Sequence, residues 1–355
     1  MPIVAHSSLP VFDKLRDDGQ TVLTLNIANQ QNIRELHIGL LNLMPDAALR
    51  VTEEQFVRLV GSCNQIAQLF VHPFSVSGLP RSKESQDYID RYYMDFQEIR
   101  RCGLDALIIT GANVSNPVLI DQEFWKPLEQ VFSWALENVT SGLWSCLVSH
   151  ALLKMLYDID RYKLPKKCWG VFDHVITNPK HPILKDINTR FDVPHSRYNA
   201  VNRDSLESAD LSVLVETVNG DVHMAVSPDQ FRVIYFQGHP EYYTMSLLKE
   251  YKREIDRYYN DELNKYPVVP SNYFSEDAVG IIEQYKDSVM SAKSTDKLLP
   301  QFPESELQMH IHNTWREAGK SIFNNWLGLI YQLTDLDRKV PFLNDVDPNN
   351  PLGIL

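Results

Sequence analysis

SGLWSCLVSH, residues 141–150, is the stretch of sequence that decides the fold of this 355-residue chain. Residues 140–145 form a short apolar run that predicts a buried strand, and LVSHALLKMLY at 147–157 predicts a helix. Cys146 stands between them, at the carboxyl edge of the expected sheet, where open α/β folds bind their ligands. The first amides of the helix carry positive potential, which favours a thiolate. We therefore interpret Cys146 as a candidate nucleophile. The other cysteines are expected to be buried and inert: Cys63, Cys102 and Cys168.

Outward from this turn, short apolar runs alternate with helical stretches along the first half of the chain. Strands are predicted at 36–43, 66–71 and 104–109, and helices at 52–61 and 124–138. Because strands that alternate with helices form βαβ units, we expect an α/β fold with a mainly parallel sheet and helices on both faces.

The second half of the chain departs from this alternation. We predict three β-like runs at 211–237, a helical stretch from 238 to about 259, an extended or excursion segment at 266–303, and a last helix at 306–333. The last helix should bring Trp315 and Trp326 back to the body of the protein. The whole chain, 1–355, is expected to form a single α/β domain. It has an N-terminal extension and a C-terminal helical return segment that starts at about residue 266.

Composition limits the kind of partner. The chain has 34 basic against 46 acidic residues, a net charge of −12. This charge argues against a general nucleic-acid or anionic-membrane binder. The four cysteines are scattered without a CxxC pair, which indicates a reducing compartment. No apolar run reaches the roughly 18 residues of a membrane span, and no signal peptide is apparent. We expect a cytoplasmic protein.

A second chemical element follows the apolar run FRVIYFQ (231–237). Gly238-His239-Pro240-Glu241 also lies at the carboxyl end of a strand, so the topology can bring it beside Cys146. A histidine two residues before a glutamate fits a base and the group that orients it, next to a thiol nucleophile. GHPE taken alone is equally consistent with a structural turn. Its combination with a cysteine at a strand-to-helix turn favours a Cys-His-Glu site.

The remaining histidines carry less information. His150 lies one helical turn after Cys146 and is expected to pack beneath it, and His195 is consistent with a polar surface loop. His310 and His312 have no acidic or cysteine partner at metal-ligand spacing, so no metal site is predicted. The chain also lacks the GxGxxG and GxxxxGK[ST] motifs of nucleotide-phosphate binding.

Further motifs run in order over nearly the whole length of the chain. They are LNLMP (41–45), TEEQ (52–55), ITGA (109–112), FW (124–125), KCWGVFDH (167–174), PHSRY (194–198), GHPEY (238–242), PSNYF (270–274), WREAG (315–319) and NNWL (324–327). With these motifs the chain resembles the homoserine O-acyltransferases of the homoserine O-succinyltransferase (homoserine transsuccinylase) family, which start methionine biosynthesis. The family fold is flavodoxin-like and is similar to class I glutamine amidotransferases, with a Cys-His-Glu triad.

The resemblance implies roles for individual residues. In the family, a cysteine takes the acyl group from acyl-CoA and passes it to the hydroxyl of homoserine. Carried over, Cys146 is the nucleophile, His239 the base and Glu241 its orienting partner. The residues that hold the amino acid fall on Lys167, Ser196 and Arg253, although solvated surface charges are the plain alternative for Lys167 and Arg253. The resemblance implies acyl-CoA as a substrate, no further cofactor, and a homodimer.

Departures from the family pattern concern the acyl group. Ala47 replaces a lysine that usually follows the LMP segment, and DAALRV (46–51) carries a two-residue insertion. Asn113 replaces a proline, and Ser115 occupies the position where glutamate goes with acetyl transfer and glycine with succinyl transfer. Because Ser115 is small and neutral, we expect room for a succinyl chain and favour succinyl-CoA over acetyl-CoA.

Three other functions remain open from the sequence. The same chemistry could use L-serine as the acceptor and feed cysteine synthesis. A glutaminase is disfavoured because glycines usually flank its cysteine, whereas here the sequence is WSCLVS. A non-catalytic homologue is disfavoured because Cys146, His239 and Glu241 are all retained.

Overall fold

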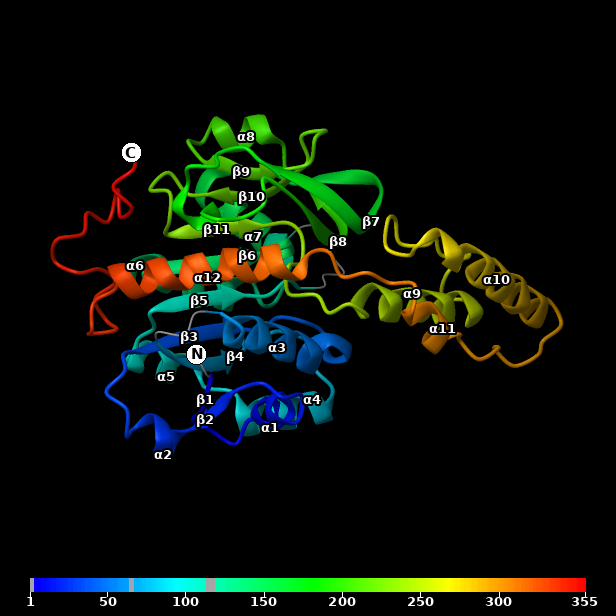
Figure 1. Cartoon of the computed structure of the whole chain (residues 1–355), viewed down its shortest axis with the longest axis horizontal. Helices are drawn as coiled ribbons and strands as arrows, with labels where there is room; N and C mark the ends of the chain where they lie inside the picture. The colour runs from blue at the N-terminus through cyan, green and yellow to red at the C-terminus, as the bar shows by residue number, and fades with distance from the viewer. Residues whose placement is uncertain (1–2, 64–66, 113–118) are drawn as a thin grey trace.

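The computed structural model describes residues 3–63, 67–112 and 119–355, and its strands form one large sheet (Figure 1). The parallel part contains, in spatial order, β2 (Val22–Thr24), β1 (Ile3–Ala5), β4 (Gln68–Phe74), β3 (Glu35–Leu41), β5 (Ala106–Ile109), β6 (Ser141–Ser145) and β11 (Val233–Phe236). The sheet continues antiparallel through β10 (Val222–Val226), β9 (Ser212–Glu216), β7 (Tyr162–Ile176) and β8 (Arg190–Ala200). The predicted α/β fold is confirmed.

Helices cover both faces of the sheet, because each central strand is apolar on both sides. In β5, Ala106 and Ile108 join one core cluster, whereas Leu107 and Ile109 join the other. The first cluster includes α1 (Val11–Asp17), α3 (Asp46–Gly61), α4 (Lys83–Tyr92) and α12 (Arg316–Leu333). The second includes α5 (Phe96–Cys102), α6 (Trp125–Asn138), α7 (Leu147–Tyr157) and α8 (Arg203–Glu207). Short elements complete the body: α2 (Leu25–Ala28), η1 (Leu119–Asp121) and η2 (Pro182–Leu184). None of the helices in the described ranges is long and apolar enough to cross a membrane.

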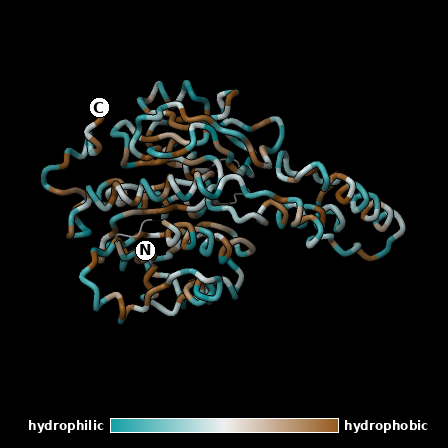
Figure 2. The backbone as a smooth tube through the Cα atoms, viewed as in Figure 1, coloured by the Kyte–Doolittle hydropathy of each residue, from teal (hydrophilic) through white to brown (hydrophobic). Residues whose placement is uncertain are grey.

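A helical arm extends from one end of the body (Figure 1). It consists of α9 (Ser246–Tyr259), η3 (Glu276–Ala278), α10 (Val279–Ser294) and α11 (Glu304–Gln308). The arm has its own apolar cluster, which also takes in Trp169, Val171 and Trp315. Apolar residues therefore recur in the arm as well as in the central sheet (Figure 2).

The arm corrects several sequence predictions. The segment 266–303 is not mainly extended, because α10 lies within it and buries Ile282, Tyr285 and Val289 at helical spacing. The predicted helix at 306–333 is two helices, α11 and α12. Trp326 returns to the body, whereas Trp315 joins the apolar cluster of the arm and donates its Nε1–H to the Tyr242 carbonyl of GHPEY. The β7–β8 hairpin and the N-terminal strands were not predicted, because their polar and apolar residues do not alternate clearly.

The PSNYF motif, between α9 and η3 of the arm, contacts β7 of the body. Gly170 of KCWGV pairs with Ser271, whose backbone bonds both Trp169 and Val171 at 2.9 Å. Tyr273 bridges to the start of α9, since its hydroxyl accepts from the Leu248 amide at 3.2 Å. The motif therefore fixes β7 relative to α9, and both of these elements carry predicted substrate-binding residues.

We predict that Gly170→Ala destabilises the protein by roughly 2 kcal/mol or more. Its φ is +144°, and an added Cβ would lie 2.1 Å from the Ser271 carbonyl oxygen, so the backbone contact must break. Urea denaturation measures the loss. The matched control is Gly280→Ala in α10, where an added Cβ meets nothing within 4 Å. The prediction is contradicted if the two variants are equally stable.

Candidate active site

The candidate site lies at the carboxyl ends of the central parallel strands. The strand order β4-β3-β5-β6-β11 is that of a flavodoxin-like sheet, and its direction of winding reverses between β3 and β5. Ligands of such sheets bind in the crevice outside this switch point. LNLMP follows β3, ITGA ends β5, Cys146 follows β6 and GHPEY follows β11, so four motifs meet at one edge.

Cys146 adopts a backbone conformation that few side chains accept. Its φ is 52° and its ψ is −116°, at the junction of β6 and α7. The Cys146 amide donates to the Phe236 carbonyl in β11 at 2.7 Å, and its carbonyl accepts from Ser149 Oγ at 2.6 Å. Ser149 Oγ in turn accepts from Gln237 Nε2 at 2.7 Å. These bonds from two neighbouring elements hold the strained turn and keep the thiol partly exposed.

His239 and Glu241 form a buried pair beside the thiol. The His239 Nδ1–H donates to Glu241 Oε1 at 2.8 Å, which directs Nε2 away from the carboxylate. Burial lowers the pKa of His239, but the Glu241 charge, the bond to Glu241 and the neighbouring Cys146 side chain outweigh burial and raise that pKa well above 6.5. The Glu241 carboxylate therefore favours the imidazolium form of His239 beside the Cys146 side chain.

A second polar group lies next to the triad and centres on Glu250 of α9. Its Oε2 accepts from Ser196 Oγ at 2.7 Å and lies 3.6 Å from Lys167 Nζ. Its Oε1 accepts from the Tyr242 hydroxyl at 2.8 Å. The Tyr242 ring stacks on His239 with their centroids 4.4 Å apart. Glu250 thus connects two predicted acceptor-binding residues to the predicted base.

The predicted acceptor residues differ in their surroundings. Lys167 is mostly buried and lies 4.1 Å from the centre of the Trp169 ring, and burial lowers its pKa although Glu250 opposes that shift. Arg253 lies one helical turn after Glu250, and its side chain is 53% exposed. Its nearest described carboxylate is Glu254 at 3.9 Å. Arg253 is therefore available to an incoming carboxylate.

Sequence reasoning missed several residues of this site. Glu250, Ser149 and Gln237 belong to no recognised motif, and Tyr242 ends the GHPEY motif without an assigned role. Only the spacing of Glu250, three residues before Arg253 on one helix face, offered a signal. Ser115 lies outside the described residues.

The structure corrects other assignments made from the sequence. Cys102 is exposed, and Cys168 is only partly buried. Cys63 is buried as predicted, and burial raises its pKa to about 12. His150 is buried behind Cys146. His195 lies in β8 and is 1% exposed, so it does not belong to a surface loop.

His195 belongs to a buried histidine cluster behind GHPEY. Its ring stacks on His174 with their centroids 5.1 Å apart, and His223 lies 5.8 Å from it. An added Cβ on Gly238 would lie 2.9 Å from His195 Cε1, so only glycine allows this approach. The cluster therefore supports the turn that carries His239. Within the described ranges, no group of three or more His, Cys, Asp or Glu side chains could hold a metal ion.

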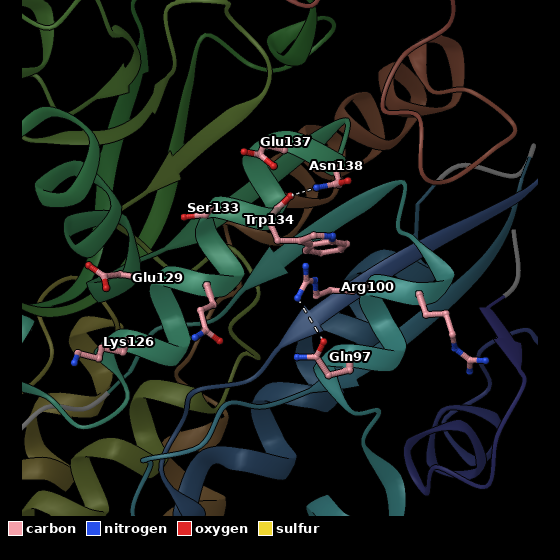
Figure 3. Close-up of a pocket in the computed structure, with 10 residues that line it drawn as sticks. Gln97, Arg100, Lys126, Glu129, Ser133, Trp134, Glu137 and Asn138 are labelled. Atoms are coloured by element: carbon pink, nitrogen blue, oxygen red, sulfur yellow. Dashed lines mark hydrogen bonds between the residues drawn. The ribbon is translucent and has the colours of Figure 1, made fainter.

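A large groove elsewhere on the surface does not contain this chemistry. It has a volume of about 1040 Å³ and lies between α5 and α6 (Figure 3). Its charged lining residues are of both signs: Arg100, Arg101, Lys126, Glu129 and Glu137. None of the described candidate site residues lines it. We therefore locate the site by its side chains and not by the size of a groove.

Comparison with known proteins decides the family. A model of the family described as homoserine O-succinyltransferase matches residues 2–336. The chain belongs to the homoserine O-succinyltransferase family. A homoserine O-succinyltransferase of Methylobacter tundripaludum is 55% identical over 354 residues, and one of Methylococcus capsulatus is 54% identical over 354 residues. In both cases the match covers 100% of each chain.

Two solved structures are distantly similar to this member of the homoserine O-succinyltransferase family. A glutamine amidotransferase of Thermotoga maritima has a TM-score of 0.43 at 10% identity, covering 84% of this chain and 99% of that chain. A glutamine amidotransferase of Methylobacillus flagellatus has a TM-score of 0.42 at 11% identity, covering 84% of this chain and 95% of that chain.

We predict that stability falls steeply below pH 6.5 because of the buried histidines. Burial lowers the pKa of His174 to about 4 and those of His195 and His223 well below 6.5. The unfolded chain therefore binds more protons than the native protein as the pH falls from 6.5 towards 4. Each such histidine lowers the free energy of unfolding by up to about 1.4 kcal/mol per pH unit.

Urea denaturation at several pH values tests this prediction. His174→Gln should reduce the slope of unfolding free energy against pH by the contribution of one histidine, which is up to about 1.4 kcal/mol per pH unit. His312→Gln, at an exposed position, should leave the slope unchanged. Equal slopes in wild type and His174→Gln would contradict the assignment.

Proposed function

We propose that this enzyme transfers the succinyl group of succinyl-CoA to the hydroxyl of L-homoserine through a thioester on Cys146. The observation that carries the proposal is the connected series Glu241, His239 and Cys146 at the carboxyl edge of the sheet, in a member of the homoserine O-succinyltransferase family. The acyl group and acceptor follow the family, and the residue roles follow the geometry.

In the first half-reaction, the Cys146 thiolate attacks the thioester carbonyl of succinyl-CoA. The carbonyl oxygen becomes an oxyanion, and the amides at the start of α7 are suited to stabilise it. The intermediate collapses by breaking the bond to CoA sulfur. His239 gives its Nε2 proton to the leaving thiolate, so that CoA departs as a thiol and Cys146 holds the succinyl group.

In the second half-reaction, homoserine replaces CoA. Neutral His239 takes the proton of the acceptor hydroxyl, and the hydroxyl oxygen attacks the Cys146 thioester. The carbon–sulfur bond breaks, which releases O-succinylhomoserine and restores the thiolate beside the imidazolium. Glu241 holds the imidazole in the required tautomer throughout.

The polar group around Glu250 fits the acceptor. Arg253 and Lys167 supply positive charge for the amino-acid carboxylate, and a guanidinium can pair with it in bidentate geometry. Glu250 supplies negative charge for the ammonium group. Because Tyr242 joins Glu250 to the His239 ring, the acceptor is placed next to the base. The homodimer and the cytoplasmic location stay predictions from the sequence.

We predict that the enzyme incubated with succinyl-CoA alone gains one succinyl group on Cys146, detected by intact mass and peptide mapping. Cys146→Ser should lose at least about a hundredfold in rate, because a hydroxyl is far less ionised than a thiol. Cys102→Ser, at the exposed end of α5, is the control and should behave as wild type. An adduct on another cysteine would refute the role of Cys146.

We predict that Arg253→Ala raises the KM for homoserine by about tenfold or more, the range of a lost charge-assisted hydrogen bond. Acylation of Cys146 should remain nearly intact, because the guanidinium acts only on the acceptor. Steady-state kinetics and burst release of CoA separate the two half-reactions. Arg257→Ala, one turn further along α9, is the matched control. Equal damage to both half-reactions would mean that Arg253 supports the fold or binds CoA.

A further inference from the structure

Arg81 is a buried cation beside the candidate site that the mechanism above does not use. It precedes α4, and its side chain is only 5% exposed. Its Nη1 donates to the Met44 carbonyl of the LNLMP motif and lies 3.5 Å from Asp46 Oδ1. Asp46 also accepts from the Ser82 amide at 2.7 Å, so its charge is shared between two donors.

The other edge of the guanidinium has no hydrogen-bond partner among the described residues. Within the described ranges, Arg81 Nε and Nη2 are both buried without a hydrogen bond. These two atoms carry parallel N–H groups on one edge, which is the edge that receives a carboxylate side-on through two hydrogen bonds. Leaving charged donors buried and unpaired is costly, so a site of this kind is built for an anion.

Contacts through Met44 place this guanidinium near the nucleophile. An added Cβ on Gly111 would lie 3.4 Å from Cys146 Cβ and 3.9 Å from Met44 Sδ, so Met44 and Cys146 face each other across Gly111. Arg81 Nη1 binds the backbone carbonyl of the same Met44. The loop that carries Arg81 also packs against the segment leading into α6, since an added Cβ on Gly78 would lie 2.7 Å from the Glu123 carbonyl carbon.

The acyl group proposed on Cys146 ends in a carboxylate, which is the kind of anion that the open edge of Arg81 can receive. An extended succinyl thioester reaches about 6 Å from sulfur to its free carboxylate oxygens, by ordinary bond lengths. That carboxylate is the one charge that distinguishes a succinyl donor from an acetyl donor.

We propose that Arg81 binds the free carboxylate of the succinyl group through Nε and Nη2 and thereby selects the acyl donor. This inference rests on the proposed function, because it assumes that the acyl group is held on Cys146. It assigns donor recognition to a cation from the segment between β4 and α4, a residue that no sequence motif singled out.

The test compares donors in the first half-reaction, with homoserine absent, by burst release of CoA and by intact mass. Arg81→Gln keeps a donor for the Met44 carbonyl but removes the charge and the paired edge. We expect the ratio of its second-order acylation rate constants for succinyl-CoA over acetyl-CoA to fall about 10 to 100-fold, with acylation by acetyl-CoA changed far less. Arg101→Gln, whose side chain is 76% exposed on α5, is the control and should keep the wild-type ratio.

Arg81→Lys keeps the charge but cannot offer two parallel donors, so it should lose only part of the preference for succinyl-CoA. Thermal denaturation shows whether Arg81→Gln folds. If it does not fold, the donor ratio of Arg81→Lys tests the proposal instead. An unchanged ratio in either folded variant overturns the proposal. An equal loss with both donors also overturns it, because Arg81 would then serve the fold or the phosphates common to both CoA esters. A wild type that succinyl-CoA does not acylate would instead refute the proposed function.

Discussion

The strained backbone at Cys146 is the constraint on which the rest of the site depends. A φ of 52° at a non-glycine residue persists only where neighbouring elements hold it. Here β11 supplies an acceptor for the Cys146 amide, while Ser149, which is itself bound by Gln237, donates to the Cys146 carbonyl. His239 follows shortly after β11, the strand that binds the Cys146 amide. The interactions that fix the nucleophile therefore also fix the distance between Cys146 and His239.

The side chains of the triad contact further buried polar groups. Tyr242 stacks on His239 and donates to Glu250, and Glu250 in turn contacts Ser196 and Lys167 of the β7–β8 hairpin. Behind the turn, the histidine cluster packs against Gly238. These histidines stay neutral in the native protein, because burial disfavours their charged form.

The distant C-terminal segment completes the same site. Trp315 Nε1 donates to the Tyr242 carbonyl at 2.8 Å, and an added Cβ on Gly319 would lie 3.0 Å from Pro240 Cβ. The start of α12 is therefore packed directly on GHPEY. The PSNYF segment pairs with β7 and thereby orients the strand that carries Lys167. Motifs that have no chemistry of their own thus fix the backbone beneath residues that do.

The sequence by itself determined the α/β fold class, the family and the residues of the predicted triad. Short apolar runs that end in turns specify parallel strands locally, and Cys146 and GHPEY sit directly at such ends. The sequence did not reveal α10, the β7–β8 hairpin, Glu250 or the open edge of Arg81. Polar residues obscure the periodicity of α10, and the hairpin is stabilised by long-range pairing that no local pattern records. The role of Glu250 depends on the side chains that hydrogen-bond to it, and the role of Arg81 depends on the donors that are left without an acceptor. Only the tertiary structure decided this, because hydrogen-bond partners and burial arise from chain segments brought together by folding.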